Sequence, residues 1–168
     1  MRRVASGAAA AIAVAAGAAF AAEPLVPPPA GAPLVLEAMA DGVQIYACEA
    51  KDQGFAWILK APEAKLTNAE GRQVATHFAG PTWKASDGSA VVGEVVARAD
   101  APGNASIPWL LLRAKSHDGA GIFAAVAFVR RSLTKDGVAP AGGCDAAHRG
   151  AELRVAYSAL YQFYGAAR

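Results

Sequence analysis

A histidine, an aspartate and a serine lie close together in the stretch His77 to Gly93, HFAGPTWKASDGSAVVG. His77, Asp87 and Ser89 are the residue types from which a hydrolase builds a general base and a nucleophile. Such sets also arise by chance in loop-rich domains, and Ser89 does not stand in a GxSxG strand-to-helix elbow. Two hypotheses follow: a small extracytoplasmic hydrolase with His77 as general base, or a hydrogen-bonded histidine that holds a corner of the fold.

The same stretch contains two signals for a change of chain direction. Asp87-Gly88 between apolar-bearing runs indicates a hairpin turn, and Gly80-Pro81 indicates a bend. Together they hold Trp83 on a short arm among polar neighbours, so we expect this tryptophan to be partly exposed. Tryptophan offers a flat apolar face with a polar edge, which suits ligand contact. The ligand-binding candidates are His77, Trp83, Asp87 and Ser89; we expect Trp57 and Trp109 to be core residues instead.

Other chemistry has weak support. None of the three histidines belongs to an HxH or HExxH pattern, so no metal site is predicted. The run Gly119 to Ala124 fits the dinucleotide pattern GxGxxA, but that function needs a preceding parallel strand and a following helix. Here a hairpin turn and strand-like residues are expected, so no cofactor is predicted.

The first residues have the pattern of a secretory signal peptide. Arg2 and Arg3 form a basic start, an apolar run extends from about Ala8 to Phe20, and Ala19-Phe20-Ala21 resembles a cleavage site. The alternative is an uncleaved anchor, but the run is shorter than the ~20 residues of a spanning helix. We therefore expect a signal peptide at 1–21, a proline-rich linker at 22–33 and one domain at 34–168. The mature protein would be periplasmic or secreted, without membrane insertion.

The charge balance bears on partners. Without Arg2 and Arg3, 14 Lys and Arg remain against 14 Asp and Glu. No basic stripe is present, so the electrostatic footprint of a nucleic-acid binder is missing. The expected partner is an unidentified small molecule or a cell-envelope component.

The chain has two cysteines, Cys48 and Cys144. In an exported protein an isolated pair usually forms a disulfide, which we predict here. Two buried free thiols or a metal pair are the alternatives, and neither cysteine has another cysteine or a histidine at ligand spacing.

Strand-like runs separated by short turns dominate residues 34–168. VQIYACE alternates after a turn signal at Ala40 to Gly42, and Pro62 is expected to end the next run. Ile107 to Lys115 predicts a strand buried on both faces, paired in a hairpin with Ile122 to Arg131. Leu153 to Tyr164 predicts a last strand with aromatic residues on one face. About nine such runs predict an all-β domain, a single antiparallel sandwich or barrel.

Six segments resemble the DUF3455 family, a group of exported bacterial and fungal proteins of unknown function. They are VQIYAC at Val43 to Cys48, FAWILKAPEAKL at Phe55 to Leu66, HFAGPTWKASDGSAVVG at His77 to Gly93, IPWLLLRA at Ile107 to Ala114, GVAPAGGCD at Gly137 to Asp145 and RVAYSALYQFY at Arg154 to Tyr164. The resemblance implies a single secreted domain and no established activity. Because the sequence shows no complete set of catalytic residues, we predict a binding or structural module centred on HFAGPTW. The alternative is the hydrolase with His77 as general base.

Overall fold

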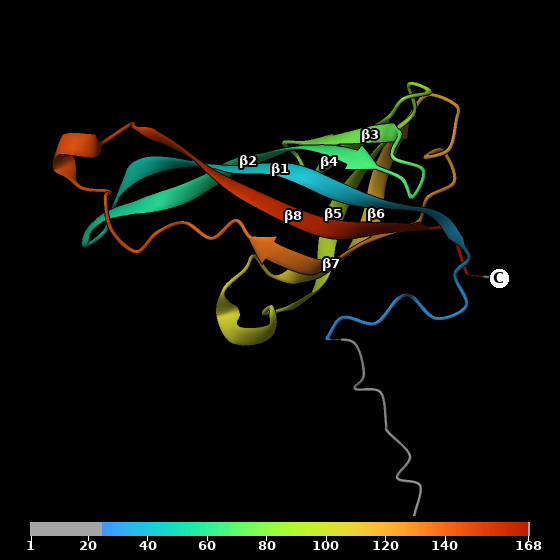
Figure 1. The fold of residues 1–168 in the computed structure, drawn as a ribbon, viewed down its shortest axis with the longest axis horizontal. Helices are drawn as coiled ribbons and strands as arrows, with labels where there is room; N and C mark the ends of the chain where they lie inside the picture. The colour runs from blue at the N-terminus through green and yellow to red at the C-terminus, as the bar shows by residue number, and fades with distance from the viewer. Residues whose placement is uncertain (1–24, 168) are drawn as a thin grey trace, which may run out of the picture.

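The fold is a closed barrel of antiparallel strands (Figure 1), in a computed structural model that describes residues 25–167. The expected all-β architecture is confirmed, and of the two predicted forms the chain adopts the barrel. The predicted signal peptide lies outside the described residues. The strands are β1 (Leu34–Lys51), β2 (Gly54–Thr67), β3 (Gln73–Phe78), β4 (Thr82–Ala85), β5 (Ala90–Ala99), β6 (Trp109–Asp118), β7 (Phe128–Asp136) and β8 (Glu152–Tyr164).

Each strand pairs with its neighbour in the sequence, and β8 closes the ring against β1. Because successive strands reverse direction, their connections alternate between two ends of the barrel. We call the end with the β1–β2, β3–β4, β5–β6 and β7–β8 connections the open end. The other, called the closed end, has the β2–β3, β4–β5 and β6–β7 connections. In Figure 1, β1, β2 and β8 extend together to the left, beyond the other strands, toward the open end.

The turn predicted at Ala40 to Gly42 is wrong, since β1 continues through these residues. Gly42 pairs with Ala64 on β2 and with Tyr157 on β8. A Cβ atom at Gly42 would lie 2.1 Å from the carbonyl oxygen of Glu63 and 2.5 Å from Cα of Ala64. This glycine therefore serves close approach of two backbones within a strand, a second use of glycine besides turns.

The expectation that Pro62 ends a strand is also wrong. The β1–β2 register shifts between Ile45, which pairs with Ala61, and Tyr46, which pairs with Leu59. Lys60 is thus an extra residue in a β-bulge, and the strand continues through Pro62, which pairs with Gln44.

The predicted hairpin of Ile107 to Lys115 with Ile122 to Arg131 is confirmed only in outline. Leu112 is buried, but the other residues of β6 are partly or fully exposed, so burial on both faces is wrong. The second strand begins later than expected, at Phe128, and extends to Asp136. Residues 122–127 lie outside the strands because Phe123 and Val126, 0% and 1% exposed, fill the closed end. Their apolar character reflects burial in a loop.

The alternation predicted for the last strand is confirmed. Tyr157, Ala159, Tyr161 and Phe163 of β8 are buried and belong to the hydrophobic core. Phe163 stacks on Phe123 with ring centroids 4.6 Å apart, which connects the core to the filling of the closed end.

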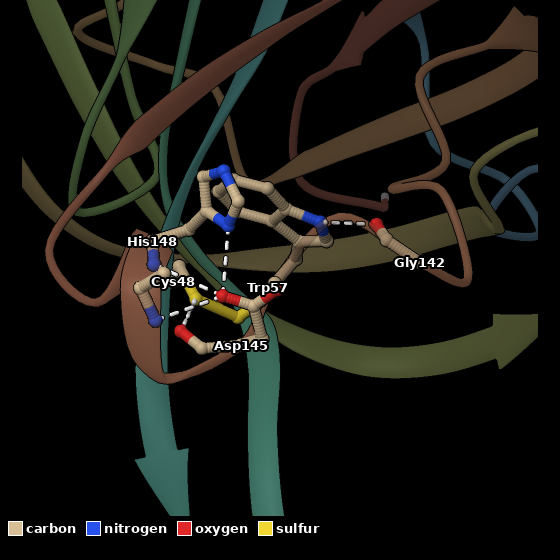
Figure 2. A network of polar contacts seen from close by, with 7 residues as sticks. Cys48, Trp57, Gly142, Asp145 and His148 are labelled. Carbon is tan, nitrogen blue, oxygen red and sulfur yellow. Dashed lines mark hydrogen bonds and ion pairs between the residues drawn. A yellow bond between two sulfur atoms is a disulfide. The ribbon is translucent and has the colours of Figure 1, made fainter.

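The predicted disulfide between Cys48 and Cys144 is present, with Cα atoms 5.4 Å apart (Figure 2). It connects β1 to the β7–β8 loop, residues 137–151. Trp57, which pairs with Cys48 across the β1–β2 hairpin, donates from Nε1 to the carbonyl of Gly142 at 2.9 Å. Trp57 is only partly buried, so its assignment to the core is wrong. The indole and the disulfide both hold the loop on the hairpin.

A short 3-10 turn at Ala146–His148 follows the disulfide in the same loop. The carboxylate of Asp145 accepts from the backbone N–H groups of Ala147 and His148 at 2.9 and 3.1 Å. Figure 2 shows His148 folded back on this carboxylate, with Nδ1 2.8 Å from it. Asp145 and His148 thus order the loop locally.

Gly42→Ala tests the close approach of β1 and β2. We expect a loss of at least about 3 kcal/mol in the free energy of unfolding, because backbone atoms cannot yield to the added methyl group as side chains can. Gly142→Ala is the control, since it adds the same group where no atom lies within 4 Å. Urea melts of both variants measure the difference, and equal stability of the two would contradict the interpretation.

Loss of the disulfide should lower stability by about 4 kcal/mol, because the bond closes a long loop in the unfolded chain. A double variant, Cys48→Ser with Cys144→Ser, measured in urea beside the wild type, gives this value. A reductant should shift the wild-type melt and leave the double variant unchanged. Two titratable thiols in the denatured, unreduced wild type would show that the bond does not form.

Candidate functional site

The open end of the barrel contains a cavity of about 900 Å³. Its walls come from β1 and β2, the β3–β4 turn, the β5–β6 loop and the start of the β7–β8 loop. Residues distant in sequence, such as Gln44, Pro81, Ile107 and Ala139, therefore meet around one space. The loop held by the disulfide supplies Val138 and Ala139, which gives the covalent bond a role in shaping this wall.

The inner wall is aromatic. His77 and Trp83, partners across the β3–β4 hairpin, stack with ring centroids 4.4 Å apart and planes at 3°. Tyr161 of β8 meets both rings edge-on, at 5.3 Å from His77 and 5.6 Å from Trp83. The partial exposure predicted for Trp83 is wrong, because the side chain is 1% exposed. The polar neighbours along the chain point away from it, whereas the barrel interior surrounds it.

His77 is held in one tautomer and is uncharged at neutral pH. Its Nδ1 lies 2.9 Å from the carbonyl of Thr82, which can only accept, so Nδ1 carries the proton and Nε2 is an acceptor. Burial lowers the pKa of His77 from 6.5 to about 4. Because the unfolded chain takes up this proton more readily, the proton-linked cost to folding is absent above pH 6.5 and grows as the pH falls toward 4.

Three buried polar atoms of residues lining the cavity have no hydrogen-bond partner among residues 25–167. They are Gln44 Nε2, Trp83 Nε1 and the Tyr161 hydroxyl, on side chains no more than 2% exposed. An unsatisfied buried polar group costs about 1–3 kcal/mol, so native proteins contain few of them. All three can donate, but protein atoms enclose them, so a molecule in the cavity would reach them only if the side chains shifted. Tyr46, by contrast, donates to the carbonyl of Gly137 at 2.6 Å.

A guanidinium group also lines the cavity. Arg131 pairs directly with Tyr161 across β7 and β8, so both side chains are on the inner face. Its Nε and Nη2 donate to the carbonyl of Pro108 at 3.1 and 2.9 Å. Within the described chain it forms no ion pair with a carboxylate, whereas Lys60 pairs with Glu49 and Arg98 lies 3.8 Å from Asp100.

The mouth of the cavity is apolar. Leu59, Val95 and Val138 line it and are 52%, 53% and 47% exposed. They come from β2, β5 and the β7–β8 loop, and thus from separate walls. An apolar molecule entering the barrel would cover these side chains, and the removal of apolar surface from water would favour binding.

Asp87 and Ser89, the other two predicted site residues, lie at the closed end. The Ser89 hydroxyl donates to Asp87 at 2.6 Å and accepts from the backbone N–H of Phe123 at 3.2 Å. The backbone N–H of Ile122 donates to the other carboxylate oxygen at 2.8 Å. These bonds, that from Ser89 first, lower the pKa of Asp87. The pair ties the β4–β5 turn to the β6–β7 loop, and only His77 and Trp83 of the predicted set share the cavity.

Gln44 and Arg131 are cavity residues that the sequence analysis did not identify, whereas Tyr161 belongs to the aromatic face predicted for the last strand. Arg131 had one available signal, since it follows the buried Val129 by two positions and so shares its face. A charge on an apolar strand face indicates an interior polar site. The sequence does not show that this face of the strand is the interior one, so the position of Arg131 was not predicted.

Residues 25–167 contain neither a cluster suited to a metal ion nor a helix suited to a membrane span. No group of three or more His, Cys, Asp or Glu side chains there could hold a metal ion. No helix in the same part of the chain is long and apolar enough to cross a membrane.

The fold and the cavity define an antiparallel β-barrel that is filled at one end and hollow at the other. The chain belongs to the DUF3455 family, described as a protein of unknown function, whose model matches residues 29–165. The resemblance of the sequence segments is thereby confirmed. Comparison with curated proteins and with solved structures gave no match.

The burial of Trp83 predicts a large loss of stability on truncation. We expect Trp83→Ala to cost about 3–5 kcal/mol, because the indole packs against three other rings of the interior. Trp109 is partly exposed, so its predicted position in the core is wrong, as it is for Trp57. Trp109→Ala is the control and should therefore cost less. Urea melts monitored by circular dichroism give both values. A greater loss for Trp109→Ala would contradict this ranking.

Proposed function

We propose that this protein is a binding module that holds a small, largely apolar molecule in the cavity at the open end of the barrel. The observation that carries the proposal is the cavity itself, which has a volume of about 900 Å³ between buried aromatic rings and an apolar mouth. A packed interior would fill such a space with side chains. The aromatic and aliphatic groups of the wall would bind the apolar part of a ligand, and Arg131 offers a polar contact to it.

The size and chemistry of the cavity support the proposal. Small-molecule sites typically have volumes of about 300–1,000 Å³ and apolar walls with a few placed polar groups. The volume here, about 900 Å³, falls in that range. Eight-stranded barrels are also wide enough to hold one small ligand.

The hydrolase alternative has less support. A base with a pKa of about 4 accepts a proton weakly at neutral pH. The predicted nucleophile, Ser89, forms its hydrogen bonds with Asp87 and Phe123 at the closed end. His77 has a clear role without catalysis, since it stacks on Trp83 and forms part of the cavity wall.

We also propose that the domain works in the periplasm or outside the cell. Two observations support this location: the signal-peptide pattern before residue 22 and the disulfide between Cys48 and Cys144. A ligand drawn from the cell envelope would be consistent with this location and with the apolar mouth of the cavity.

Binding of anilinonaphthalenesulfonate, a fluorescent aromatic anion, tests the proposal. We expect a saturable rise in its fluorescence with the folded wild type. Ala139→Trp should weaken this binding at least about tenfold, because the indole would occupy space at a cavity-lining position. Ala141→Trp is the matched control, since Ala141 is an exposed residue of the same loop outside the lining. No saturable binding, or equal binding by the two variants, would contradict the proposed function.

A further inference from the structure

We propose that the ligand is an amphiphilic anion, an apolar molecule with a carboxylate or similar charged group that binds at Arg131. This inference rests on the proposed function and specifies the chemistry of what the cavity takes. The anionic group would enter first, and the apolar part would extend toward Leu59, Val95 and Val138 at the mouth.

The position of Arg131 is the first argument. Arginine on the inner face of a small barrel is costly unless its charge is compensated. Arg131 is half-buried beside Tyr161, and the carbonyl of Pro108 is the acceptor for its Nε and Nη2. A carbonyl carries only a partial charge and leaves other guanidinium N–H groups available. An anionic ligand would supply the missing charge through charge-assisted hydrogen bonds.

The other charges around the cavity do not fill this role. Asp100, the one carboxylate among the lining residues, is exposed and lies 3.8 Å from Arg98. Glu49 pairs with Lys60 on the β1–β2 hairpin. The lining therefore has three cationic side chains against a single carboxylate, and only Arg131 of the three lacks an acidic partner in the described chain.

The neighbouring groups leave Arg131 as the charge that a ligand would meet. The unpartnered atoms of Gln44, Trp83 and Tyr161 are enclosed by protein, so they would bond a carboxylate only if the side chains shifted. His77 is neutral, so it does not compete as a second cation, and its ring forms part of the aromatic wall. The guanidinium therefore sets the preference, because a cationic ligand would meet its charge and no buried carboxylate of residues 25–167 lines the cavity.

The probes are three molecules with the same twelve-carbon chain: dodecanoate, dodecanol and dodecyltrimethylammonium, used below their micelle-forming concentrations. Quenching of intrinsic tryptophan fluorescence measures binding to the wild type. We expect dodecanoate to bind at least about tenfold more tightly than either of the others, the difference that one charge-assisted contact provides. Equal affinity for dodecanoate and dodecanol would overturn the inference and leave the proposed function intact. Binding by none of the three would contradict both.

Variants of Arg131 locate the effect. Arg131→Gln should remove the preference for dodecanoate over dodecanol, and Arg131→Lys should retain most of it. Arg149→Gln is the control, since it removes a positive charge from an exposed loop position outside the cavity lining. Circular dichroism melts check that each variant folds. If Arg131→Gln does not fold, the comparison of the three probes on the wild type still decides. A preference that survives in folded Arg131→Gln would overturn the assignment to this residue.

Discussion

Strand β1 forms hydrogen-bonded ladders with both β2 and β8, and the rest of the structure depends on this closure. Without it, the sheet would have two open edges and its aromatic face would be exposed to solvent. Closure demands that backbones approach closely at Gly42, where no side chain fits. It also places the alternating residues of β8 inside the barrel, on the inner side of the cavity.

The two ends of the barrel use polar residues differently. At the closed end, Asp87 and Ser89 accept hydrogen bonds from the backbone of the β6–β7 loop. Phe123 fills the space beneath this loop. At the open end, donors of Gln44, Trp83 and Tyr161 are without partners in the described chain. Satisfied polar groups stabilise a fold, whereas buried unsatisfied ones raise its free energy. The cavity lies at the open end, which is why we assign binding to it.

The disulfide connects this chemistry to the covalent structure. Cys144 and the Trp57–Gly142 hydrogen bond hold the β7–β8 loop against the β1–β2 hairpin. Val138 and Ala139, at the start of that loop, form part of the cavity wall. A long loop without such attachments would sample many conformations, and ordering it would oppose ligand binding.

The sequence by itself determined the strand periodicity, the Asp87-Gly88 turn and the family, because these depend on local patterns. It also determined the cysteine pairing, because two cysteines allow one intramolecular disulfide. Only the tertiary structure decided that Trp83 is buried, that Arg131 points inward, and that His77 and Ser89 belong to opposite ends. Alternation shows which residues share a face of a strand, but it does not show which face becomes the interior. That choice is made by closure of the sheet, through contacts between residues more than a hundred positions apart, such as Ala40 and Ala159.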